Sequence, residues 1–89
     1  MPANHMLDIF YFAWVAERIG RRSEQVDGHY RDMTIADLLS HHAGSSPGHA
    51  AAFATPGKLR AALDQRFVPL DTLIGDATEL AIFPPVTGG

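Results

Sequence analysis

Apolar and polar residues alternate at both ends of the chain, and this pattern predicts a strand at each end. Residues 7–13 place apolar side chains on both faces of an extended chain: Leu7, Ile9 and Tyr11 on one side, Asp8, Phe10 and Phe12 on the other. Residues 79–83 place Leu80 and Ile82 on one side, and Glu79, Ala81 and Phe83 on the other. We therefore expect a central strand near the N-terminus and a second strand that ends at Phe83.

The middle of the chain predicts helices and a hairpin. A short helix fits residues 14–19 with Gly20 as its stop, and residues 23–26 resemble a returning strand. Thr34 followed by Asp37 is typical of a capping box, and the apolar residues after it recur at helical spacing up to His42. This is the clearest helix in the sequence. Residues 59–68 alternate around a tight turn at Asp64-Gln65, which predicts a hairpin.

Two further expectations concern the segments between these elements. The small and helix-breaking residues 43–48 predict an exposed loop. Leu70 and Leu73 are expected to fill the core. Terminal strands, one main helix and a later hairpin together predict an α+β fold, in which a sheet has the helix packed on one face.

The open face of that sheet is a candidate binding surface. Asp8 and Glu79 mark the sides of the terminal strands that are least suited to burial, and this places Phe10, Phe12 and Phe83 on the uncovered face. Grouped exposed aromatic residues form docking patches for partners. The alternative, that these residues belong to the core, is equally compatible with the pattern.

The C-terminus is the candidate site of chemistry. Pro84 and Pro85 cannot donate ladder hydrogen bonds, so the preceding strand must leave its sheet there. The six residues after Phe83 reach at most roughly 20 Å, and Gly88-Gly89 carries no Cβ that would obstruct a narrow cleft. We expect a domain over residues 6–83, a disordered extension over 1–5, and an extended tail whose carboxylate a partner can enclose. The tail comprises Pro84, Pro85, Val86, Thr87, Gly88 and Gly89.

Composition excludes several classes of function. With 89 residues the chain is one small domain, and its net charge of −3 argues against phosphate-backbone binding, although Arg18, Arg21, Arg22 and Arg31 offer a local basic spot. The chain has no cysteine, so no thiol can act as nucleophile or metal ligand. The longest apolar stretch, residues 9–16, is too short to span a bilayer, and we expect a cytoplasmic protein.

Other chemistries find little support. The histidines 41, 42 and 49 lie near one loop, with 5 and 29 elsewhere, but adjacent helical histidines diverge and no matching carboxylate spacing accompanies them. We interpret them as solvated or helix-terminal and expect no metal. No glycine loop that would cradle a phosphate appears, so we expect no bound cofactor.

Four segments, in order, resemble the small subunits of molybdopterin synthase, which are ubiquitin-like sulfur carriers of the β-grasp fold. They are Phe10-Tyr11-Phe12-Ala13-Trp14, Glu17-Arg18-Ile19-Gly20, Ala61-Ala62-Leu63-Asp64-Gln65 and Ala81-Ile82-Phe83-Pro84-Pro85-Val86-Thr87-Gly88-Gly89. The aromatic-Pro-Pro-Val lead into the diglycine is the most specific feature. Asp64 replaces a common Asn, and Ala77 replaces a common Gly before the last strand, where an alanine makes a left-handed turn costlier.

The resemblance implies a function for the tail. An ATP-dependent adenylating enzyme would activate the Gly89 carboxylate, a sulfur donor protein would convert it to a thiocarboxylate, and the large subunit of molybdopterin synthase would receive it. The chain would then be a sulfur-carrying co-substrate, not an enzyme alone, with Phe12 and Phe83 matching the family's exposed aromatics. Two alternatives stay open. One is a related carrier for thiamine synthesis or a protein modifier, and the other is an interaction module without terminal chemistry.

Overall fold

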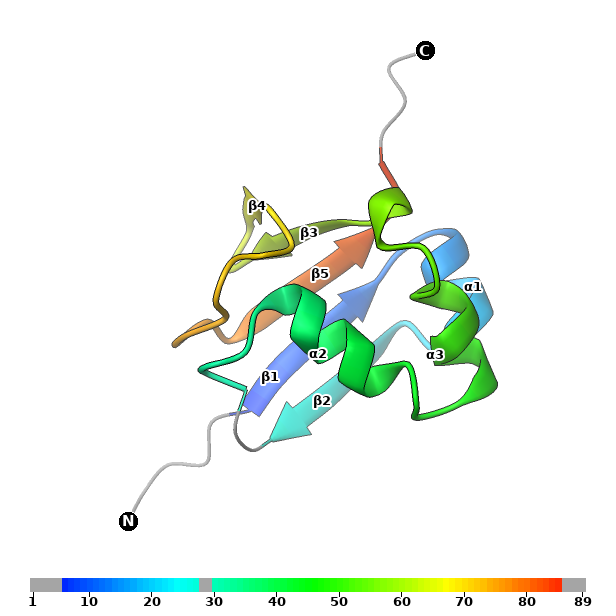
Figure 1. Cartoon of the computed structure of the whole chain (residues 1–89), viewed down its shortest axis with the longest axis horizontal. Helices are drawn as coiled ribbons and strands as arrows, with labels where there is room; N and C mark the ends of the chain where they lie inside the picture. The colour runs from blue at the N-terminus through cyan, green and yellow to red at the C-terminus, as the bar shows by residue number, and fades with distance from the viewer. Residues whose placement is uncertain (1–5, 28–29, 86–89) are drawn as a thin grey trace.

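The computed structural model describes residues 6–27 and 30–85, which form one five-stranded mixed sheet. The strand order is β2-β1-β5-β3-β4, with β1 and β5 parallel and every other neighbouring pair antiparallel (Figure 1). The bounds are β1 Met6–Tyr11, β2 Ser23–Asp27, β3 Arg60–Leu63, β4 Arg66–Val68 and β5 Glu79–Phe83. The five strands predicted from the sequence, two of them in the hairpin, are confirmed. The first predicted strand, β1, lies inside the sheet and ends at Tyr11, two residues earlier than predicted. The central position of the sheet belongs to β5.

Helices cover one face of this sheet. In the described residues they are α1 Trp14–Ile19, α2 Ile35–His42 and α3 Pro47–Ala52, with a 3-10 turn η1 at Pro56–Lys58. Helix α2 lies across the sheet, whereas α1 and α3 gather at the end toward which β1 and β5 point (Figure 1). No helix in the described part of the chain has the length and apolarity needed to cross a membrane.

The predicted helix starts and stops are confirmed for α1 and α2. The capping box of α2 is complete, because Asp37 N donates to Thr34 Oγ1 over 3.0 Å and Thr34 N donates to Asp37 Oδ2 over 3.3 Å. Gly20 ends α1 in the left-handed conformation, with φ 87°.

The predicted loop over residues 43–48 is wrong in its second half, where α3 begins. Ser46 caps this helix by accepting a 3.1 Å hydrogen bond from His49 N, and Pro47 occupies its first turn. Gly48 costs helix propensity but is required by packing, because a Cβ there would lie 2.3 Å from the Arg18 carbonyl oxygen of α1. One of the small residues that suggested a loop, Gly48, is thus the point of close contact between α1 and α3.

The core lies between the sheet and α2. Leu7, Ile9, Leu80 and Ile82 are fully buried, as the strand alternation predicts, and the apolar stripe of α2 covers them. The expectation that Leu73 fills the core is wrong, since 59% of it is exposed. Thr34 and Leu73 form a bridge, and the next residue in this extended segment, Ile74, points inward instead. Leu70 is half-buried against the core, as expected.

Two tight turns set the hairpin and the entry to β5. Asp64 and Gln65 both have positive φ, 48° and 71°, which is the geometry of a two-residue hairpin turn. Before β5, Gly75 takes the left-handed position with φ 57°, and Ala77 is buried. The alanine therefore does not strain this turn, because the turn places its positive φ two residues earlier.

Candidate functional site

An apolar row crosses the uncovered face of the sheet. Strand register places Phe10 beside Ala81, Ala81 beside Ala62, and Ala62 beside Phe67. Phe83 lies on the same face next to Arg60, and its ring centroid is 5.6 Å from that of Phe67. We call this surface the aromatic face; it comprises Phe10, Ala62, Phe67, Ala81 and Phe83.

The predicted aromatic residues lie where the alternation placed them. Phe10 and Phe83 are half-buried on the aromatic face. Phe12 lies beyond the end of β1, is 51% exposed, and donates its N–H to Ile82 O over 3.1 Å beside β5. The structure thus confirms the predicted open side of the sheet for Phe10 and Phe83, and the docking role of these residues stays a prediction.

Sequence reasoning missed Phe67, the most exposed large apolar side chain of the described residues at 83%. Its signal was present in the predicted hairpin, because a two-residue turn at Asp64-Gln65 pairs Phe67 with Ala62 and so fixes its face. Phe67 and Phe83 line an open apolar groove of about 420 Å³. Its other lining residues are Arg60, Ala61, Val68 and Pro69.

The tail leaves the sheet beside this groove. Strand β5 ends at Phe83, and Pro84 and Pro85 follow outside the sheet, which confirms the stop that the prolines predict. These prolines line a second hollow, of about 500 Å³, together with residues of α1, α3 and η1. The predicted site residues Val86, Thr87, Gly88 and Gly89 lie outside the described residues.

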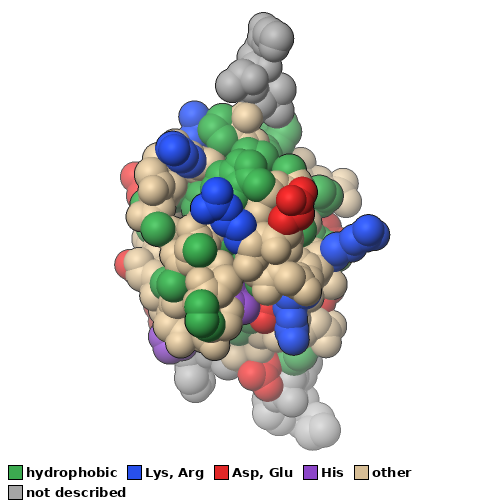
Figure 2. Space-filling model, turned by 90° about the vertical axis from the view of Figure 1, so that its right-hand side faces the viewer, with side chains coloured by type: hydrophobic (Ala, Val, Ile, Leu, Met, Phe, Trp, Pro, Cys, Tyr) green, Lys and Arg blue, Asp and Glu red, His purple; other side chains and the backbone are tan. Residues whose placement is uncertain are grey.

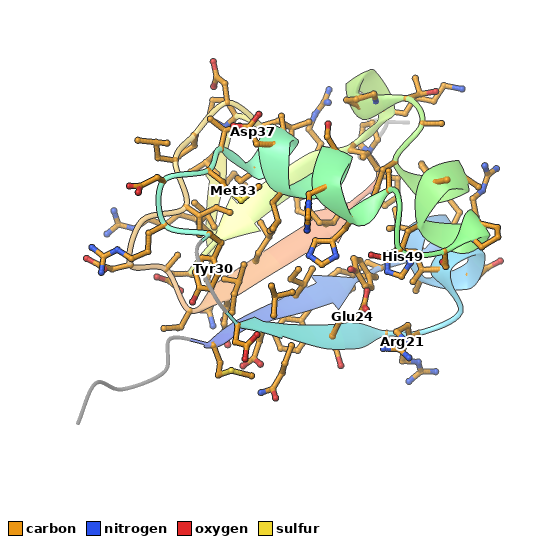
Figure 3. All side chains as sticks on the ribbon, turned by 60° about the horizontal axis from the view of Figure 1, so that its bottom comes forward. Arg21, Glu24, Tyr30, Met33, Asp37 and His49 are labelled. Carbon is orange, nitrogen blue, oxygen red and sulfur yellow. The ribbon has the colours of Figure 1, made fainter. Side chains whose placement is uncertain are left out.

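A buried polar cluster lies on the opposite face, between β2 and α3. His49 Nε2 is 2.5 Å from Glu24 Oε2, and its Nδ1 is 2.7 Å from Ser46 Oγ. Tyr11 donates its hydroxyl to Glu24 Oε2 over 2.6 Å. Glu24 and His49 point toward one another, with Arg21 at the outer edge (Figure 3). The interpretation of His49 as solvated is therefore wrong, because it ties α3 to the sheet.

The pKa shifts in this cluster are those of groups that stabilise the fold through hydrogen bonds. Burial alone would raise the pKa of Glu24, but hydrogen bonds from Tyr11 and His49 lower it. Burial, followed by the Glu24 hydrogen bond, raises the pKa of Tyr11. Burial lowers the pKa of His42, at the end of α2. Within the described ranges, no three His, Asp or Glu side chains come close enough together to hold a metal ion.

Comparison with known proteins places this architecture in a family. The model of the ThiS family matches residues 9–89. The molybdopterin synthase sulfur carrier subunit of Escherichia coli (strain K12) is 38% identical over 84 residues, which cover 94% of this chain and 100% of that protein.

Solved structures share the fold. Small archaeal modifier protein 1 of Haloferax volcanii has a TM-score of 0.66 at 31% identity, covering 91% of this chain and 98% of its own. In Helicobacter pylori, a complex of subunits 1 and 2 of molybdopterin-converting factor contains a similar chain, with a TM-score of 0.58 at 19% identity, covering 94% of this chain and 99% of that one. The β-grasp fold, the proline-led tail and these matches together establish that the chain belongs to the ThiS family of ubiquitin-like proteins.

Proposed function

We propose that this chain carries sulfur for molybdopterin synthesis as a thiocarboxylate on Gly89. The observation that carries the proposal is the exit of β5 into Pro84-Pro85 at the rim of the aromatic face. A partner that covers this face is then placed to receive the tail. The Escherichia coli relative, a molybdopterin synthase sulfur carrier subunit, supports the same role.

The chemistry needs activation from outside the chain. A C-terminal carboxylate is ionised at neutral pH and is a poor electrophile. An adenylating partner joins the Gly89 carboxylate to the phosphate of AMP and releases pyrophosphate from ATP. A persulfide of the sulfur donor protein then attacks the Gly89 acyl carbon and displaces AMP, and a thiol reductant cleaves the resulting S–S bond, which releases the donor as a thiol and leaves the Gly89 thiocarboxylate. In the acceptor reaction sulfur passes to the precursor pterin, and water restores the carboxylate.

The partner for the last step is the large subunit of molybdopterin synthase. The Helicobacter pylori complex of subunits 1 and 2 supports a two-subunit assembly of this kind. The aromatic face, with Phe12 beside it, supplies the docking surface, because its exposed apolar side chains have no cover within the described part of the chain. We place these reactions in the cytoplasm.

Two changes at the terminus test the proposal. Deletion of Gly89, or an uncleavable extension beyond it, should abolish conversion of the precursor pterin by the reconstituted synthase, because the reacting acyl carbon is lost or blocked. Circular dichroism and calorimetric binding to the large subunit should change little, because the sheet is intact. Mass spectrometry of the unmodified chain should show one oxygen replaced by sulfur after activation. Pterin conversion by the extended chain would overturn the proposal.

A second candidate is supported by the likeness to small archaeal modifier protein 1. In that role Gly89 would form an isopeptide bond with a lysine of a target protein. Isopeptide conjugates detected by peptide mass spectrometry of cell extract, absent when Gly89 is deleted, would favour the modifier function. A thiocarboxylate without conjugates would favour the carrier.

A further inference from the structure

Charge is segregated along the axis that leads to the tail. Five of the seven Lys and Arg residues lie at the end of the sheet where β5 exits. These are Arg18, Arg21, Arg22, Lys58 and Arg60. The opposite end carries Asp8, Asp27, Asp64, Asp76 and Glu79 at strand ends and turns. The chain is acidic overall, yet the end that presents the tail is basic.

The hollow beside the tail root concentrates this positive charge. Arg18 and Lys58 line it from α1 and η1, and Pro84-Pro85 forms its edge. Trp14, Ala51 and Ala52 add apolar lining, and Thr55 completes it. The Arg18 guanidinium lies over the Trp14 ring, 5.0 Å from the ring centre, which holds this cation in place. Positively charged and apolar side chains lie together on this side of the molecule (Figure 2).

Within residues 6–27 and 30–85, no carboxylate neutralises the two cations from within the hollow. No described acidic residue lines it, and neither Arg18 nor Lys58 forms an ion pair with another described residue. Glu17 precedes Arg18 in α1 and is exposed, but it does not line the hollow. In contrast, Arg21 is paired with Glu24, and Arg31 is paired with Asp76.

We propose that this hollow binds an acidic side chain of the protein that receives the tail. The inference rests on the proposed insertion of the tail. It adds the chemistry of the partner surface around the tail's entrance, which would place a carboxylate between Arg18 and Lys58. The two cations fit a carboxylate, and the apolar lining of Ala51, Ala52 and the two prolines fits its methylene stem. Because the hollow adjoins Pro84 and Pro85, a carboxylate held there fixes where the tail enters.

The first experiment reverses the charge of the hollow. The double variant Arg18→Glu/Lys58→Glu and the wild type are titrated with the large subunit of molybdopterin synthase from the same organism, at several salt concentrations. We expect at least a tenfold weaker Kd and slower association at low salt, with the difference shrinking as salt rises. An unchanged Kd and salt dependence would overturn the proposal.

The matched control reverses two cations at the other end of the molecule. Arg31→Glu/Arg66→Glu changes the net charge by the same amount but lies away from the tail root. We expect its Kd to stay within about twofold of the wild type. An equal loss in both variants would mean that net charge alone sets affinity, and the hollow would not be a site. Thermal unfolding of both variants confirms that each is folded.

The second experiment detects the contact directly. A zero-length carbodiimide couples an amine only to a carboxylate in contact with it, so peptide mass spectrometry of the treated complex should show Lys58 joined to an Asp or Glu of the large subunit. Lys58→Arg removes the amine that couples, so the same treatment of this variant should give no product at position 58. Normal binding of the wild type with no product at Lys58 would overturn the proposal. Failure of the wild type to bind at all would instead overturn the proposed function.

Discussion

At the residue scale, the strongest consequence of the structure concerns Phe67. Phe67 is 83% exposed and its ring packs at a tilt against that of Phe83, so it contributes little to the fold but a large apolar area to any protein that covers the aromatic face. We predict that Phe67→Ala weakens binding to the large subunit by about 1–2 kcal/mol in calorimetry. The free energy of unfolding should change by less than about 0.5 kcal/mol.

Leu73 provides the control for this change. It is also exposed, at 59%, but lies in the segment before β5 and outside the aromatic face. Leu73→Ala should bind the large subunit as the wild type does. If both alanine variants bind equally, the aromatic face is not the docking surface.

His42 should make stability depend on pH. Burial lowers its pKa in the folded chain below the ordinary value of about 6.5, so the unfolded chain binds the proton more readily. Stability is therefore complete above that ordinary value and falls as the pH drops below it toward the folded pKa. Urea unfolding from pH 7.5 to 5.5 should show this loss, reduced in His42→Gln.

His41 is the neighbour that controls for the substitution, since it lies exposed on the same helix. His41→Gln should keep most of the pH dependence of the wild type, because burial, the largest cause of the lowered His42 pKa, stays while only the smaller effect of the His41 charge is lost. Equal acid loss in the wild type and in His42→Gln would show that another group is responsible.

The polar cluster of Glu24 and His49 could not be predicted from the sequence. The sequence shows His49 as one of three histidines near a loop, and nothing local marks Glu24 as its partner. The two meet only because β2 and α3 are brought together by the fold, 25 residues apart in the chain. Strand alternation groups Phe83 with Glu79 and Ala81 on one face, and the structure then shows that this is the face without helices.

At the element scale, the contact between α1 and α3 depends on one glycine. A Cβ at Gly48 would lie 2.3 Å from the Arg18 carbonyl oxygen, which is too close for the helices to keep their positions. We predict that Gly48→Ala lowers the free energy of unfolding by about 1–3 kcal/mol in urea titration, despite the higher helix propensity of alanine.

Gly57 is the matched control for that change. A Cβ there meets no atom within 4 Å, and no positive φ would strain it. Gly57→Ala should leave stability within about 0.5 kcal/mol of the wild type. A similar effect of both substitutions would contradict a role for close helix packing.

Helices with local signals were predictable, and the helix that packing maintains was not. The start of α2 could be predicted because Thr34 and Asp37 cap it within four residues of sequence. In α3 only Ser46 and Pro47 indicate a start. The next residue, Gly48, has low helix propensity, and its reason becomes clear only when its close contact with α1 is seen. The prediction that Leu73 fills the core was wrong for a similar reason, because the bridge between Thr34 and Leu73 depends on the fold and cannot be read from the local sequence.

At the scale of the whole molecule, the end of the sheet could be predicted from the sequence, because β5 ends at Phe83 and the two prolines that we call the stem, Pro84 and Pro85, follow outside it. Alternation fixed the faces of β1 and β5, and the prolines fixed the end of β5. The hollow at the tail root could not be predicted, because Trp14, Lys58 and Pro84 come from three distant segments. Its chemistry depends on how α1, η1 and the stem converge.

The stiffness of the stem should itself favour tail insertion. Each proline restricts the backbone before binding, so less conformational entropy is lost when a partner orders the stem. We predict that Pro84→Ala/Pro85→Ala weakens binding to the large subunit by about 1–2 kcal/mol in total, mainly in the entropy measured by calorimetry. The matching double glycine variant should bind more weakly still, while both unfold thermally as the wild type does. Equal affinity across the three chains would show that the stem contributes contacts or length but not stiffness.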